Sequence, residues 1–209
     1  PVSALPGGVR ALPEVGTLEN LDKALPDAIG AAEKLCELAF SSSQVSRLAE
    51  AFTGSELALI NEDANPDVFG TQVRVVREQK IIDEFSFGKW NERIGEENPG
   101  SPAPRPYLRA LGVDEGRYRV GPVSQLSIGT LPTPLAAAVQ ERWLAVSRHA
   151  ASAPAIITLH LLERTAEIVE QLSRLVGQVN PEENMAGRQV KFSSGQASGL
   201  VDGPRGILA

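Results

Sequence analysis

The sequence predicts an α+β fold that is mainly helical, in which long amphipathic helices pack together and a small antiparallel sheet accompanies them. Two patterns support this class: apolar residues recur every three or four positions over long stretches, and short runs rich in Val, Ile and Phe separate the first such stretch from the others. With 42% hydrophobic and 22% charged residues, 209 residues suffice for one sizeable core. We therefore predict a single domain over residues 1–209.

The first part of the chain, residues 1–53, is predicted to be helical after an irregular entry. Pro26 is expected to kink the long helix or mark a restart, because proline removes a backbone hydrogen bond and clashes with the preceding turn. Thr17 is a candidate N-cap, and residues 43–52 are expected to continue the helix or follow a brief break. The face that packs inward carries Leu18, Leu21, Leu25, Ile29, Ala32, Cys36 and Ala39.

A small antiparallel meander is predicted over residues 54–94, where the period of the apolar residues changes. Its strands are residues 56–60, 71–77 and 80–85, which are short and rich in Val, Ile and Phe. The last two strands are separated only by Glu78 and Gln79, which requires a tight turn without the usual glycine.

The second half of the chain is predicted to be a loop, a helix pair and a tail. Residues 95–131 are expected to be irregular, because four prolines fall between positions 95 and 106. A helix pair follows within residues 132–177, spanning roughly 132–150 and 154–176, and a polar tail covers residues 178–209. The last helix has an apolar seam for packing against other helices and an opposite face predicted to be solvated, which carries Glu163, Arg164, Glu167, Glu170 and Arg174.

Charge and composition exclude several classes of partner and site. The net charge of −6 and the absence of a Lys/Arg-rich run argue against nucleic acid and anionic membranes. No apolar stretch is long enough to span a bilayer and no signal peptide is recognisable at Pro1, so we expect a cytoplasmic protein. Cys36, the single cysteine, is predicted to be a core residue, and His149 and His160 are predicted to be packed side chains rather than metal ligands.

Two segments place arginine between glycine and proline residues. The first covers residues 107–112 and 116–126, and the second covers residues 199–208, where Arg205 stands between Pro204 and Gly206. Stiff irregular backbone of this composition suits a fixed positive charge at a reacting centre, and it equally suits a tight structural corner. From the residues alone, both interpretations stay open.

Read together, these segments resemble the large (alpha) subunit of nickel-iron hydrogenases, of the cytoplasmic bidirectional type that includes NAD-reducing and F420-linked enzymes. The family's Pro-Gly-Gly-Val turn corresponds to residues 6–9, and its Leu-Gly and Gly-x-Tyr-x-Val-Gly-Pro stretch to residues 111–112 and 116–122. Its Gly-x-x-Glu-Ala-Pro-Arg-Gly-x-Leu motif corresponds to residues 199–208, with Asp202-Gly203 in place of Glu-Ala. The resemblance extends over essentially the whole chain.

The resemblance implies heterolytic splitting of dihydrogen at a nickel-iron centre that carries CO and CN ligands. Arg205 matches the family's arginine beside the open side of the metals and is the expected catalytic residue, while Pro204 and Asp202 are expected to line the site. A fixed cation in such a site acts by preorganised electrostatics. In the family, the partners are a small subunit with iron-sulfur clusters and, in some members, a diaphorase module.

The departures from the family concern the metal ligands. The two Cys-x-x-Cys pairs that hold the centre are absent, and the segment around Ser124-Gln125 has Ala-Arg in the family. We therefore interpret the chain as an internal segment of a large subunit that holds no metal or cofactor and is inactive alone, and that self-associates because its long helices lose their cover. The alternative is a non-enzymatic scaffold or partner-binding protein that has lost the cysteines.

Overall fold

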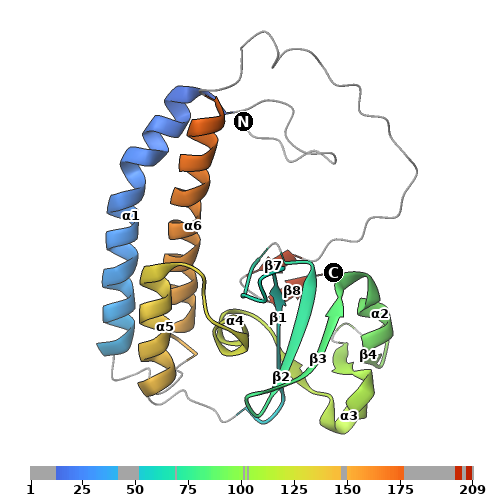
Figure 1. The fold of residues 1–209 in the computed structure, drawn as a ribbon. Coiled ribbons are helices and arrows are strands. Elements are labelled where there is room, and N and C mark those ends of the chain that lie inside the picture. The colour runs from blue at the N-terminus through green and yellow to red at the C-terminus, as the bar shows by residue number, and fades with distance from the viewer. Residues whose placement is uncertain are drawn as a thin grey trace, which may run out of the picture.

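The computed structural model describes residues 13–41, 52–68, 70–100, 102, 104–146, 150–176, 201–203 and 206–208. It confirms the predicted α+β, mainly helical class (Figure 1). The helices are α1 (Val15–Ser41), α2 (Trp90–Arg93), α3 (Gly112–Glu115), α4 (Pro122–Ile128), α5 (Pro134–Val146) and α6 (Ala153–Val176), with 3₁₀ turns η2 (Phe87–Lys89) and η3 (Arg109–Leu111). The strands are β1 (Ser55–Ile60), β2 (Gln72–Arg77), β3 (Lys80–Ser86), β4 (Ile94–Glu97), β5 (Arg105–Leu108), β6 (Tyr118–Arg119), β7 (Val201–Gly203) and β8 (Gly206–Leu208).

The described elements form a helical layer beside a small sheet (Figure 1). Helices α1 and α6 lie side by side and run in opposite directions, so that together they make a long helical hairpin. Helix α5 packs beside one end of α6, and α4 lies between this end and the sheet.

Helix α1 differs in two details from the sequence prediction. It begins at Val15 rather than after Thr17, whose backbone N–H donates to the carbonyl of Glu14. It also runs unbroken through Pro26, so the predicted restart is wrong. Packing of the apolar seam against α6 holds the helix on both sides of this proline, which offsets the single lost hydrogen bond. The predicted helical stretch over residues 43–52 lies outside the described residues, except for Phe52, which is not helical.

The predicted meander is confirmed, and a strand from elsewhere extends it. The sheet has the order β3-β2-β1-β6, in which β1, β2 and β3 pair antiparallel and β6 joins β1 in parallel. Glu78 and Gln79 connect β2 to β3 with φ of 50° and 64°, the left-handed values that a two-residue hairpin turn of this kind needs. The pairing of β6 was not predicted, because a two-residue strand has no readable period.

The prediction that residues 95–131 form a loop is wrong, because short strands and helices, including η3 and α3, occupy much of this range. Strands β4 and β5 pair as an antiparallel ribbon, and β6 and α4 follow. Pro106 is accommodated because it stands opposite Glu96 in a two-stranded ribbon, where each strand keeps one free edge on which no N–H is needed. The predicted helix pair is confirmed as α5 and α6, although α5 ends at Val146 instead of residue 150.

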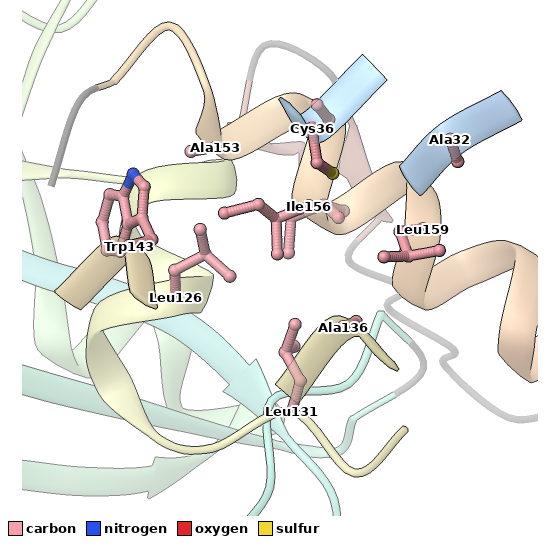
Figure 2. Packing of buried hydrophobic residues seen from close by; sticks show 11 residues of the cluster. Ala32, Cys36, Leu126, Leu131, Ala136, Trp143, Ala153, Ile156 and Leu159 are labelled. Carbon is pink, nitrogen blue, oxygen red and sulfur yellow. The ribbon is translucent and has the colours of Figure 1, made fainter. Parts of the chain in front are cut away.

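Separate apolar clusters fill the two layers. In the helical layer the side chains of α1, α4, α5 and α6 converge, and Figure 2 shows Trp143 and Leu126 facing Ile156 of α6. Members of this cluster with no more than 2% exposure are Cys36, Leu126, Leu131, Ala136, Trp143, Ala153, Ile156 and Leu159. The sheet has its own cluster, formed by Leu57, Leu59, Val73, Val75, Phe85, Ile94 and Leu108.

Buried polar side chains connect these parts. Arg74 of β2 donates from Nη1 to the carbonyl of Ile128 at the end of α4 (3.1 Å), and its Nε pairs with Glu84 (2.6 Å). Gln140 of α5 donates to the carbonyls of Leu126 (2.9 Å) and Gly129 (2.7 Å), and its Oε1 accepts from a backbone N–H. Because every one of these groups is paired, their burial fixes the orientation of α4 toward both neighbours.

Candidate functional site

The segment that carries the predicted catalytic arginine forms a hairpin at the end of the chain. Strands β7 and β8 pair antiparallel, with Asp202 opposite Ile207 and Gly203 opposite Gly206. Pro204 and Arg205 connect the two strands and lie outside the described residues, as do the turn at residues 6–9 and His149. The roles assigned to Arg205, Pro204 and Asp202 therefore remain predictions.

The other arginine-bearing segment, residues 116–126, is a structural corner. A Cβ on Gly116 would lie 2.4 Å from the carbonyl oxygen of Gly112 and 2.6 Å from that of Leu108, so only glycine fits. Gly121 has φ of 99°, after which Pro122 begins α4. Backbone geometry thus accounts for both glycines of the Gly-x-Tyr-x-Val-Gly-Pro motif, in agreement with the interpretation of this segment as a structural corner.

The charged group in this corner is a half-buried cluster of Glu56, Arg119 and Ser124. Nε of Arg119 lies 2.7 and 2.8 Å from the two carboxylate oxygens of Glu56, and the Ser124 hydroxyl donates to the same carboxylate (2.6 Å). The guanidinium also lies over the ring of Phe52, 4.8 Å from its centroid. Glu56 retains only 13% exposure of its side chain. The cluster joins β1, β6 and α4.

A small hollow lies where α4, α6 and the loop after β1 meet. Its volume is about 10 Å³, which is room for one water molecule at most and too little for a substrate. The lining residues are Pro66, Asp67, Val68, Gln125, Leu131, Ile157 and His160.

His160 on the wall of this hollow is packed and hydrogen-bonded, as predicted. Its Nδ1 lies 2.9 Å from the Thr133 hydroxyl, and the residue is 5% exposed. Burial lowers the pKa of His160 below its usual value, and the positive charge of Arg164 lowers it further, against the opposing effect of nearby carboxylates. Burial therefore favours the neutral form of the imidazole.

Glu163 contradicts the prediction that its face of α6 is solvated. The residue is only 7% exposed, and its carboxylate accepts the backbone N–H groups of Leu135 (3.0 Å) and Ala136 (2.8 Å) in the first turn of α5. It acts as an N-terminal cap supplied by another helix. The signal available in the sequence was indirect: the first turn of α5 has no acidic residue, so its free N–H groups need an acceptor from elsewhere. The ion pair between Glu170 and Arg174 on the same helix is present and exposed.

Cys36 is a core thiol in the packing between α1 and α6, as predicted. It is 1% exposed, and burial, with the negative charges of Glu37 and Glu33, raises its pKa to about 11. Such a thiol is a poor source of the thiolate that soft metal centres need. Across the part of the chain that the structure describes, no three His, Cys, Asp or Glu side chains gather into a possible metal site.

The fold of the chain is that of a hydrogenase component. Its structure superposes on a chain from a crystal structure of an NAD+-reducing [NiFe]-hydrogenase in the H2-reduced state with a TM-score of 0.76 and 24% sequence identity. The match covers 98% of this chain and 47% of the hydrogenase chain. No helix in the described ranges has the length and apolar character needed to cross a membrane.

A sequence relationship to one such enzyme accompanies the shared fold. The chain is 30% identical over 167 residues to subunit beta of the NAD-reducing hydrogenase HoxS from Cupriavidus necator. This alignment covers 73% of the present chain and 32% of the relative, so the chain spans about a third of that protein. No family model matches the sequence. The chain is therefore homologous to a hydrogenase subunit, as the motifs indicated.

Proposed function

We propose that these residues form the internal scaffold of a nickel-iron hydrogenase large subunit, and that the longer protein catalyses reversible heterolytic oxidation of dihydrogen. The observation that carries this proposal is the continuous match in fold over 98% of the chain, joined to 30% identity with a hydrogenase subunit. In this proposal the packed helices and the sheet have a structural role, and only the terminal hairpin contributes to the reacting centre.

Arg205 is the residue of this chain that we assign to the chemistry. It follows β7 and precedes β8, so a short paired ribbon carries the Pro204-Arg205 connection at both ends. A guanidinium carries a permanent positive charge in proteins. A fixed positive charge in a site that excludes water stabilises developing negative charge without reorganisation. Pro204 and Asp202 are proposed to line the same site.

The metal ligands are proposed to lie in sequence beyond these 209 residues. A nickel-iron centre with CO and CN ligands requires soft thiolates, and the sequence contains one cysteine. That cysteine is buried in the helical core with a raised pKa, so the donor set of this chain does not fit the centre. We accordingly propose that the chain alone is metal-free and inactive, and we assign no step of the reaction through the metals to its residues.

The proposed partners follow from the class of enzyme. The relative is named as one subunit of an NAD-reducing hydrogenase, which supports a heteromeric complex for the longer protein as well. We propose a small subunit with iron-sulfur clusters, with a diaphorase module as a further component, in the cytoplasm. The negative net charge of −6 does not favour nucleic acid.

A non-enzymatic scaffold or partner-binding protein is the second candidate. The observation that favours it is the Glu56–Arg119–Ser124 cluster, in which the buried Ser124 hydroxyl of the first arginine-bearing segment and the Glu56 carboxylate of β1 are used for structural bonds. The single cysteine supports the same candidate.

The coding sequence on both sides of these residues separates the two candidates. The hydrogenase proposal expects a Cys-x-x-Cys pair on each side, and their absence on both sides would leave the scaffold as the better explanation. Metal analysis of the purified 209-residue chain is expected to show no stoichiometric nickel or iron. Binding of either metal at one equivalent would contradict the proposed position of the ligands.

Arg205→Lys in the longer protein tests the assigned role, with dihydrogen-dependent dye reduction and metal content as readouts. We expect activity to fall by about a hundredfold at unchanged metal content, because lysine keeps the charge but not the planar donor geometry. Arg174→Lys, at an exposed ion pair of α6, is the matched control and should keep full activity. Equal activity of both variants would remove Arg205 from the reaction.

A further inference from the structure

The hollow between α4, α6 and the loop after β1 brings together polar side chains from three elements. Asp67 belongs to the loop, Gln125 to α4 and His160 to α6, and the rest of the lining is apolar. The hollow measures about 10 Å³, which is the space of one water molecule. A space of this size holds water when about two to four polar groups border it, and these side chains meet that condition.

The loop that carries Asp67 is fixed by hydrogen bonds of the protein itself. The backbone N–H of Asp67 donates to the carbonyl of Leu59 in β1 (3.1 Å). Within the loop, the N–H of Asn65 donates to the side-chain oxygen of Asn61 (3.0 Å), whose own N–H donates to the carbonyl of Asn65 (2.9 Å). The carboxylate of Asp67 is thus carried on an ordered backbone, which lowers the entropic cost of binding at the hollow.

The hydrogen bond between His160 and Thr133 decides which nitrogen of the ring carries the hydrogen. Nδ1 lies 2.9 Å from the Thr133 hydroxyl, and Thr133 is fully buried. With the hydrogen on Nδ1, the hydroxyl would have to accept, and its own hydrogen would need a second acceptor in a place closed to water. With the hydrogen on Nε2, the hydroxyl donates to Nδ1 and is satisfied.

The charges around the ring favour the same position of the hydrogen. Burial and then Arg164 lower the pKa of His160, whereas the negative charge of Asp67 opposes this shift. Because Asp67 borders the hollow, its charge stabilises an N–H group that points to the hollow more than one that points to Thr133. Hydrogen bonding and electrostatics thus both place the hydrogen on Nε2.

We infer that the hollow binds one water molecule, which accepts a hydrogen bond from Nε2–H of His160 and donates one to the carboxylate of Asp67. All donors then follow one direction, from Thr133 through the ring and the water to the carboxylate. The amide of Gln125 offers a further hydrogen bond, and about three bonds are typical of a buried water. The water joins the loop after β1 to α6. The inference stands whether or not the longer protein is a hydrogenase, because it uses only these side chains.

The first test is NMR of the 209-residue chain at about pH 8, where neutral imidazole prevails. Long-range correlation of the ring C–H groups with the ring nitrogens identifies the nitrogen that carries the hydrogen. The sequence has two histidines, so comparison with His160→Gln assigns the signals. We expect the hydrogen on Nε2, and a hydrogen on Nδ1 would overturn the inference.

The second test is a crystal structure of the same chain. We expect one ordered water within about 3.2 Å of both Nε2 of His160 and a carboxylate oxygen of Asp67. A hollow without an ordered water would overturn the inference.

Variants of Asp67 show whether its carboxylate holds the water. Asp67→Ala should lose the ordered water, and Asp67→Asn should keep it, because the amide oxygen is still an acceptor. Asp63→Ala, at an exposed position of the same loop, is the matched control and should also keep it. A water that stays in place in Asp67→Ala, or that is lost in Asp63→Ala, would contradict the assigned acceptor.

Discussion

The two ends of helix α6 are built differently. Its first part, residues 153–163, contacts α1, α4 and α5, and side chains such as Ile156 and Leu159 are fully buried there. Its second part, residues 164–176, packs in the described structure mainly against α1, through Val169 and its neighbours. The same amphipathic pattern thus serves a three-sided core at one end and a two-helix contact at the other.

Polar groups follow the same division. Near the first end, Glu163, His160 and Gln140 are buried and hydrogen-bonded to groups of other elements. At the second end the polar contacts are exposed ion pairs, such as the pair between Glu170 and Arg174, which contribute little in water. The comparison indicates that the contacts that stabilise the fold and fix its geometry are concentrated where α6 meets α5. Residues 164–176, at the other end of α6, are more exposed.

Among the variants that test this comparison, Trp143→Ala should cause the largest loss of unfolding free energy. The indole is fully buried in the helical cluster, and its removal leaves a cavity that costs about 4 kcal/mol of unfolding free energy. Leu144→Ala, at the neighbouring position with 38% exposure, should cost less than about 1 kcal/mol. Urea unfolding followed by far-UV circular dichroism measures both values. Similar losses for the two variants would show that α5 is not packed as described.

Glu163→Ala should have the next largest effect, about 3 kcal/mol, because it leaves two N–H groups of α5 without their acceptor. Glu167→Ala, one turn later with 42% of its side chain exposed, should change stability by less than about 0.5 kcal/mol. Glu163→Gln, which retains one acceptor oxygen, should recover part of the loss. If the Ala variants at positions 163 and 167 unfold at the same urea concentration, the capping role is wrong.

The sequence was sufficient to predict the elements in which the apolar pattern repeats many times. The seam of α6 and the three strands of the meander repeat their pattern often enough that position along the chain determines which face is buried. Pro26 and the turn at Glu78-Gln79 show the limit of local rules, because tertiary packing and strand pairing outweigh the local preferences of these residues.

The site was only partly accessible from the sequence. The corner at Gly116 and Gly121 was recognised as rigid, but the sequence does not show that the carbonyl oxygens of Gly112 and Leu108 would lie 2.4 and 2.6 Å from a Cβ on Gly116. Glu163 and Ser124 were not identified as buried, because their partners are 27 and 68 residues away in the chain. A polar residue on a helix looks solvated until the element that covers it is known.

Amide hydrogen exchange should detect a difference in opening free energy between the two parts of α6, which is smaller than the effects of the two substitutions above. We expect residues 164–176 to open with a free energy about 1–2 kcal/mol lower than residues 153–163, because they bury fewer side chains and make fewer buried polar bonds. Uniform protection along the whole helix would mean that the hairpin opens as one unit. The two ends of α6 would then not differ in local stability.

The pH dependence of stability should reveal the smallest effect, at His160. Its pKa is lowered in the folded state relative to 6.5, so below about pH 6.5 the unfolded chain takes up a proton that the folded chain refuses. Stability is therefore complete above this pH and falls as pH decreases toward the folded-state pKa, with Asp67, Glu163, Glu167 and Arg164 as the charges that face the ring. His160→Gln keeps a hydrogen-bonding group near Thr133 and should flatten the profile between pH 5 and 7. A variant whose unfolding free energy still falls in parallel with that of the wild type would show that another group titrates, and that the ring near α5 is not held neutral by burial.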